Sequence, residues 1–297
     1  MPGGERIFRM QRRRLLAAAG LALGTAGCLG TDDDGDDATG TTSTATTASD
    51  ATTASDATTT ASATLDVTEA TLQGALVFLE TDYLSTTGGD GRYLLANAFV
   101  SEGRVDRRDV ALRVDGTEYA PDDGRTASRL WRVYQSGSAF EPDLGGLLLF
   151  ELPATGFDST SDAAVTWPGG EHRLRDGLRE RLRADAPEFS VSITPPDTLA
   201  QGESPEFDVA VTNEGAVPGR FVAGLNRYGP RVASTPAKRF SVLADAGATE
   251  RTSYTGGISG YRVPDEDLGD DDADLRYGWN GADDDRTFPI EYVAADS

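Results

Sequence analysis

The feature that most constrains the fold is the strict alternation of apolar and polar residues in Phe189-Ser-Val-Ser-Ile-Thr194. Successive side chains of a β-strand point to opposite faces, so this pattern predicts a strand with one buried face. Similar short runs recur along the chain and are separated by Gly, Pro, Asn and Asp. The strand–helix–strand order of parallel-sheet folds is missing from the sequence. We therefore predict an all-β chain of two antiparallel sandwiches.

The two predicted sandwiches comprise residues 65–186 and 187–297, because Pro187 interrupts the strand pattern just before its clearest run. Within the first, Asp115-Gly116 is a strong signal for a two-residue hairpin. Two segments stay open: 72–80 fits a helix or a strand, and 178–182 fits a helical turn or the end of a strand. The other predicted strands are 92–100, 146–152, 165–167, 172–174, 207–211, 221–225, 240–242 and 288–292.

Residues 1–27 have the layout of an export signal. Five arginines, the last being Arg14, precede an apolar run that ends at Gly27. This run is shorter than the about 20 residues that a membrane-spanning helix needs, but it suits the core of a signal peptide. The alternative is a short buried N-terminal helix that ends in a buried cysteine.

Two motifs make the export hypothesis specific. Gln11-Arg12-Arg13-Arg14-Leu15-Leu16 resembles the twin-arginine motif, in which Arg12 and Arg13 would be the recognised pair. Thr25-Ala-Gly-Cys28 resembles a lipobox, although Thr25 stands where leucine is usual. The resemblance implies that the protein is exported in its folded state. It also implies that Cys28 carries a lipid, which would hold the chain on the extracellular face of the cell membrane.

Residues 28–64 are predicted to be a disordered stalk behind the lipidated cysteine. From Thr31 to Thr64 the chain consists of Thr, Ala, Ser, Asp and Gly, and the hexapeptide Ala-Thr-Thr-Ala-Ser-Asp occurs at 45–50 and at 51–56. Such a composition cannot bury a core. The dense hydroxyl groups fit an O-glycosylated stalk, and a bare linker is the equal alternative.

The charge of the chain indicates a salt-rich environment. Acidic residues number 49 against 27 basic ones, the formal net charge is −22, and Lys238 is the single lysine. Hydrated carboxylates keep a protein soluble in molar salt, where repulsion between charges is screened within a few ångströms. We interpret the chain as a protein of a halophilic archaeon; an acidic mesophilic protein is the alternative. This charge excludes nucleic acid as an expected partner, because phosphate binding requires clustered Lys and Arg.

Two local resemblances support the sandwich prediction. The stretch from Leu199 to Gly215, with its glycine turn, its alternating strand and Asn213-Glu-Gly, resembles immunoglobulin-like, cell-adhesion-related modules of prokaryotic surfaces. Residues 92–100 and 146–153 resemble, less specifically, the telokin-like sandwiches of lipoproteins. Both resemblances imply immunoglobulin-like folds and say little about a ligand.

Signals for catalysis are weak. The chain has one cysteine and one histidine, His172, and contains no Gly-X-Ser-X-Gly motif. After lipidation of Cys28 no thiol would remain, so we predict no catalytic residues. Trp131, Trp167 and Trp279 are interpreted as packing residues rather than sugar platforms.

An acidic run is the one candidate for a metal site. A loop with so many carboxylate oxygens could bind Ca²⁺. Counted from Asp265, however, the twelfth position is Arg276, where the EF-hand pattern requires a bidentate glutamate. The simpler interpretation is a solvated acidic loop, so we expect no cofactor apart from this Ca²⁺ hypothesis. We further expect 255–287 to be a long loop suited to binding. The candidate ligands are Asp265, Asp267, Asp270, Asp272 and Asp274.

The sequence thus predicts a lipid-anchored surface module with a binding or structural role toward an unidentified surface protein or envelope component. Two alternatives stay open. One is a solute-binding lipoprotein of a transporter, although such proteins usually contain repeated strand–helix units. The other is a surface hydrolase whose working carboxylates cannot be distinguished among so many acids.

Overall fold

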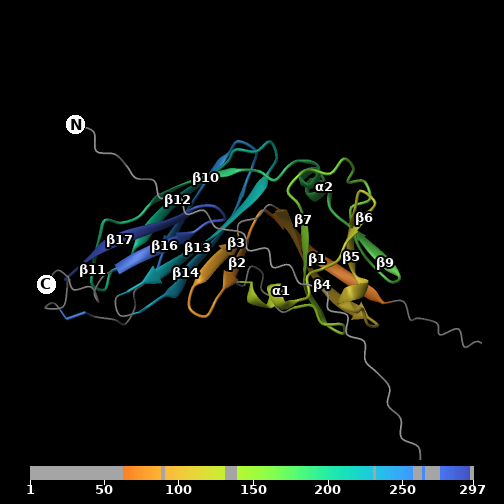
Figure 1. The fold of residues 1–297 in the computed structure, drawn as a ribbon, viewed down its shortest axis with the longest axis horizontal. Coiled ribbons are helices and arrows are strands. Elements are labelled where there is room, and N and C mark those ends of the chain that lie inside the picture. Colours follow the sequence, from red (N-terminus) through yellow and green to blue (C-terminus); the bar gives the residue numbers. More distant parts are fainter. Residues whose placement is uncertain are drawn as a thin grey trace, which may run out of the picture. The chain divides into compact units, whose positions relative to one another are not determined.

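The computed structural model describes residues 63–87, 91–130, 139–229, 232–256, 263–264 and 275–294, and Thr58–Ser297 form one compact unit. The described residues form an all-β protein with sandwich packing, which confirms the predicted fold class (Figure 1). Between the named strands every pairing is antiparallel except that of β11 with β17. No helix of this part of the chain is both long and apolar enough to cross a bilayer.

The first sandwich consists of a three-stranded sheet, with β4 at its centre, and a four-stranded sheet in the order β6-β5-β8-β9. Its core contains apolar residues of both sheets, together with Leu178 and Leu182 of the helix α2 (Asp176–Arg183). Of the two interpretations of residues 178–182, the helical turn is therefore correct. The strands are β1 (Thr64–Gln73), β4 (Gly91–Glu102), β5 (Ala111–Val114), β6 (Thr117–Tyr119), β7 (Gly145–Pro153), β8 (Ala164–Trp167) and β9 (Gly170–Arg173).

Strand β4 is buried on both of its faces. Leu94, Ala96 and Ala98 point into the sandwich core. Leu95 points the other way and packs with Leu76 in a smaller cluster that also includes Ala127 of α1 (Arg125–Arg129). This double burial explains why the strand reads as an almost continuous apolar run instead of an alternating one. A short 3-10 turn, η1 (Arg107–Asp109), precedes β5.

The second sandwich pairs a three-stranded sheet, β10-β12-β15, with a five-stranded sheet, β11-β17-β16-β13-β14. Its core is aromatic, and Trp279 and Tyr277 are both almost fully buried. Burial raises the pKa of the Tyr277 phenol, so this hydroxyl stays protonated over the accessible pH range. The strands are β10 (Phe189–Thr194), β11 (Thr198–Ala200), β12 (Glu206–Asn213), β13 (Gly219–Tyr228), β14 (Thr235–Ala244), β15 (Thr249–Thr255), β16 (Leu275–Asn280) and β17 (Asp285–Val293).

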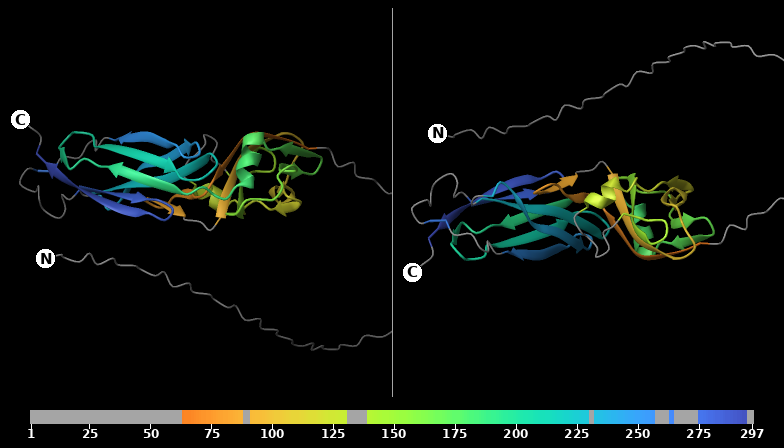
Figure 2. Two further views of the ribbon diagram at one scale, coloured as in Figure 1. Left: turned by 90° about the horizontal axis from the view of Figure 1, so that it is seen from above. Right: turned by 90° about the horizontal axis from the view of Figure 1, so that it is seen from below.

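The antiparallel hairpin of β2 (Leu76–Leu79) and β3 (Leu84–Thr87) packs against the second sandwich. Its apolar residues form a cluster with Val222 of β13. Figures 1 and 2 show these two orange strands beside the blue-green strands of the second sandwich. Residues 72–80 thus contain the end of β1 and the whole of β2, which decides the open helix-or-strand question in favour of strands.

The hairpin between β5 and β6 is held by a carboxylate from another segment. Asp115 and Gly116 both have positive φ angles, 52° and 70°, as a tight two-residue turn requires. The Gly116 N–H donates to Asp162 Oδ2 at 2.8 Å, and the Asp115 N–H donates to Oδ1 at 2.9 Å. The hydrogen bond from Gly116, followed by that from Asp115, lowers the pKa of Asp162.

We expect Asp162→Asn to destabilise the protein more at neutral pH than in acid. Because the folded-state pKa of Asp162 is lowered, its stabilising contribution is complete above the unfolded pKa, about 3.9, and is lost as the pH falls through the folded value. Thermal melts at pH 7 and near pH 2.5 measure the difference. Asp158→Asn is the control, because Asp158 is exposed and has no hydrogen bond or ion pair within the described residues. If Asp162→Asn lowered the melting temperature equally at both pH values, the ionised carboxylate would not be what stabilises the hairpin.

Candidate functional site

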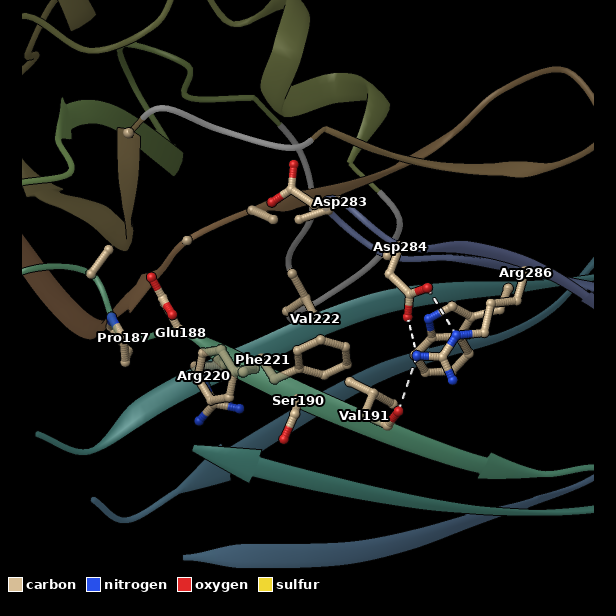
Figure 3. A pocket seen from close by; sticks show the side chains of 18 residues that line it. Pro187, Glu188, Ser190, Val191, Arg220, Phe221, Val222, Asp283, Asp284 and Arg286 are labelled. Atoms are coloured by element: carbon tan, nitrogen blue, oxygen red, sulfur yellow. Dashed lines mark hydrogen bonds and ion pairs between the residues drawn. The ribbon is translucent and has the colours of Figure 1, made fainter. Parts of the chain in front are cut away.

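A groove of about 680 Å³ lies beside the first strand of the second sandwich. One wall is β10 together with Pro187, and the opposite wall is the turn from Gly281 to Asp284, which joins β16 to β17 (Figure 3). Phe221 and Val222 of β13 lie between the two walls. The size of the groove is within the range of ligand sites, about 300–1,000 Å³.

The groove lies where it does because β10 and β11 belong to different sheets. Among the described strands β10 pairs with β12 alone, and Pro195-Pro196 separates it from β11, which pairs with β17. Proline cannot donate to a ladder, so the strand ends there and the chain crosses to the other sheet. This crossing leaves a seam between β10 and the beginning of β17.

Arg286 bridges this seam. Its guanidinium binds the Asp284 carboxylate through Nε–Oδ1 at 2.8 Å and through a second nitrogen to Oδ2 at 2.5 Å. The same second nitrogen donates to the Val191 carbonyl at 3.0 Å (Figure 3). One arginine thus neutralises the nearest carboxylate and shows that an outward carbonyl of β10 accepts hydrogen bonds from the groove side.

The floor of the groove is aromatic and contains unpaired donors. Phe221 stacks on Trp279 with ring centroids 6.1 Å apart and meets Phe189 edge-on at 5.6 Å. Two buried N–H groups, Trp279 Nε1 and Arg220 Nε, have no hydrogen-bond partner within the described residues. Unpaired buried donors are unusual in native proteins, where most such groups are satisfied. They mark the floor as a place that could accept a ligand's oxygen atom.

The predicted site residues fall mostly outside this region. Arg12, Arg13, Cys28 and the Ca²⁺ candidates between Asp265 and Asp274 lie outside the described residues. Among the residues that are described, no three His, Cys, Asp or Glu side chains are grouped in a way that could hold a metal ion. His172 is half-buried on β9, where it pairs with Val165.

The prediction of a single loop over 255–287 is wrong. Residues 275–280 form β16 and residues from Asp285 onward form β17, and Val263 is buried with its N–H bonded to the side chain of Gln201. The alternation of Leu275, Tyr277 and Trp279 is the strand signal, but the intervening glycine and the flanking aspartates obscure it. The packing interpretation is correct for Trp167 and Trp279, and Trp131 lies outside the described residues.

Sequence reasoning also missed the groove itself. The clearest strand of the sequence, β10, was identified, but its open edge depends on which strands pair with it. The absence of charge and proline within Phe189–Thr194 instead suggests a strand that is paired on both sides, since edge strands usually carry such residues.

The fold and the groove define an all-β, two-sandwich protein with an open sheet edge. No protein-family model and no curated protein matches the sequence. Among solved structures, a β-glucosidase from Listeria innocua aligns with 43% of this chain and 18% of its own length, at 15% identity and a TM-score of 0.31. A CARDB domain from Pyrococcus furiosus, solved with two metal ions, aligns with 37% of this chain and 96% of that domain, at 16% identity and a TM-score of 0.26. The chain therefore spans less than a fifth of the length of the β-glucosidase, and similarities this weak carry no functional argument.

Proposed function

We propose that this chain is a lipid-anchored surface protein of a halophilic archaeon whose β-sandwiches bind another macromolecule outside the cell. The N-terminal support is the order of Arg12-Arg13, apolar run and Cys28, followed by a Thr- and Ser-rich stretch. The observation that carries the binding role is the groove beside β10, which combines an apolar floor, unpaired buried donors and an open strand edge. A rigid sandwich can present such a surface without any catalytic group.

The rival functions have less support. A carboxylate hydrolase needs an acid and a second carboxylate facing one substrate position, about 5–9.5 Å apart. In the groove, Asp284 is engaged by Arg286, and the other two carboxylates, Glu188 and Asp283, are exposed at its rim. A solute-binding lipoprotein is expected to contain repeated strand–helix units, whereas α1 and α2, the α-helices of the described residues, have five and eight residues.

The anchor is tested by replacing Cys28. We expect Cys28→Ser to abolish lipidation and to leave the signal peptide uncleaved or misprocessed, and Arg12→Lys with Arg13→Lys to block export. Fractionation of the native host and mass spectrometry of the mature N-terminus measure both effects. Ser62→Ala, in the Thr/Ala/Ser-rich stretch, is a control that should change neither. A Cys28→Ser protein that is still cut after Gly27 and stays in the membrane would refute the anchor assignment.

The binding role is tested separately. Cross-linking of the native protein in its own membrane, in molar salt, would identify the bound macromolecule.

A further inference from the structure

β10 is an edge strand that lacks the usual protection against pairing. It contains three apolar and three hydroxyl residues, with neither charge nor proline, and it pairs with β12 without a register shift. The other long edges differ. β14 carries Pro236 and the exposed Lys238, and β15 carries the exposed pair Glu250-Arg251. Because charges and prolines are the common devices that keep edges from pairing, β10 is the edge of this sandwich that is suited to accept another strand.

The backbone of β10 presents its hydrogen-bonding groups to the groove. In an antiparallel pair, alternate residues direct both N–H and C=O toward the partner strand. The Glu188 carbonyl accepts from Glu214 N–H at 2.9 Å, on the β12 side, and Arg286 reaches the Val191 carbonyl from the opposite side. The alternation therefore turns the N–H and C=O groups of Phe189, Val191 and Ile193 away from β12. They lie along one edge of this six-residue strand, which is about 20 Å long, and Phe189 and Val191 are the two of these residues that line the groove.

The groove is lined by three carboxylates, Glu188, Asp283 and Asp284, and by two guanidinium groups, Arg220 and Arg286, so its lining carries one net negative charge. Glu188 and Asp283 are exposed, and neither carboxylate has an ion pair within the described residues, whereas Asp284 is neutralised by Arg286. Figure 3 shows the carboxylates of Glu188 and Asp283 at separate positions around the floor of the groove. A cationic side chain on the occupant would meet an unpaired carboxylate. A second copy of this chain would bring two more carboxylates to the same place, where close like charges repel even in molar salt.

We propose that an extended basic peptide segment of a partner protein binds in this groove as an additional strand along β10. Its backbone pairs with Phe189 and Val191, and its inward apolar side chains lie on Phe221 and Val222. Its arginine or lysine side chains reach Glu188 and Asp283. Strand addition of this kind takes its affinity from the main chain and its specificity from alternate side-chain pockets. The proposal rests on the surface-binding function above and names the class of its partner.

The test uses the purified full-length chain and three synthetic peptides. The first is Arg-Thr-Val-Thr-Val-Thr-Val-Thr-Arg, the second has glutamate at both ends, and the third is the first peptide with alternate backbone nitrogens methylated. Binding is measured by calorimetry at the lowest salt concentration that keeps the protein folded, and amide hydrogen exchange locates the peptide. We expect the basic peptide alone to bind and to protect the amides of Phe189 and Val191. Val191→Pro removes the backbone N–H of Val191 that points away from β12. This substitution should weaken binding of the basic peptide about three- to tenfold.

Charge variants complete the experiment. Glu188→Gln combined with Asp283→Asn should weaken binding of the basic peptide severalfold and reduce its salt dependence, without a change in the melting temperature. Glu250→Gln, on the edge β15, is the matched control and should leave binding unchanged. Equal binding of the acidic and basic peptides, protection at β14 or β15 instead of β10, or no binding of any peptide would overturn the proposal. Self-association that Val191→Pro abolishes would also overturn it, because the occupant would then be a second copy. None of these results depends on Cys28, so failure here is separate from failure of the surface assignment.

Discussion

Replacing Arg92 by methionine is expected to cost about 3–5 kcal/mol of folding free energy, one of the two largest effects that the structure predicts. Arg92 lies at the start of β4 and is 2% exposed. Its five N–H groups contact five backbone carbonyls: those of Pro153, Thr155, Arg181, Leu182 and Ala184. Removal of the guanidinium leaves these buried acceptors without their donors, and losses of this size are typical for breaking a buried charged network.

The position of Arg92 at the end of α2 explains why no carboxylate is needed as a direct partner. Three of the five carbonyls belong to the last turn of the helix or follow it, and this end carries the negative part of the helix dipole. Burial lowers the pKa of Arg92 and the nearby Asp185 carboxylate opposes this shift, but an arginine stays protonated at any accessible pH. The arginine thus joins β4, the end of β7 and α2.

Denaturant unfolding of three variants measures this contribution. Arg92→Lys retains the charge but has three donors instead of five, so it should lose less stability than Arg92→Met. Arg108→Met is the control, because that arginine is 82% exposed and should change stability by less than about 0.5 kcal/mol. A loss for Arg92→Met as small as that of the control would contradict the network.

The regular parts of this fold could be predicted from the sequence because their cause is local. The alternation in Phe189–Thr194 and the turn at Asp115-Gly116 each depend on a few neighbouring residues, and both features are present in the structure. The role of Arg92 could not be predicted in this way. Its partners lie 61 to 92 positions further along the chain, and they are backbone carbonyls that carry no residue-specific signal.

The candidate site, like the role of Arg92, could not be predicted from patterns of neighbouring residues. The residues that line the groove come from five separate segments, and their apolar members resemble ordinary core residues. The acidic residues of 265–285 made this range the candidate in the sequence, yet the described residues of the range that line the groove are Trp279 and the turn from Gly281 to Asp284. The open edge of β10 follows from strand order, which single-sequence periodicity does not determine.

Replacing Asn226 by alanine is expected to release the β2–β3 hairpin and to cost about 2–4 kcal/mol. Asn226 is fully buried in β13, and its side chain pairs with the backbone of Leu84 as a neighbouring strand would. Oδ1 accepts from the Leu84 N–H at 2.6 Å, and Nδ2 donates to the Leu84 carbonyl at 2.8 Å. Alanine would leave both backbone groups buried and unpaired.

Further contacts near Asn226 and Leu84 also hold the hairpin against the second sandwich. Gly224 allows Leu84 to approach, since a Cβ there would lie 2.8 Å from the Cβ of Leu84. The Thr86 hydroxyl adds a bond to the Asn280 carbonyl at 2.7 Å. Because the same hairpin also packs on the first sandwich through Leu76, we expect the wild-type protein to unfold in one transition and Asn226→Ala to separate it into two.

Hydrogen exchange distinguishes this effect from a general loss of stability. In Asn226→Ala the Leu84 amide should exchange far faster, while the amides of β12 keep most of their protection. Asn213→Ala is the matched control, because Asn213 is equally buried but bonds the carbonyls of Val217 and Ala244 within its own sandwich. That variant should weaken β12 and its neighbours and leave Leu84 protected. Unchanged exchange at Leu84 in Asn226→Ala, or a single unshifted transition, would mean that the apolar cluster around Val222 holds the hairpin without the asparagine.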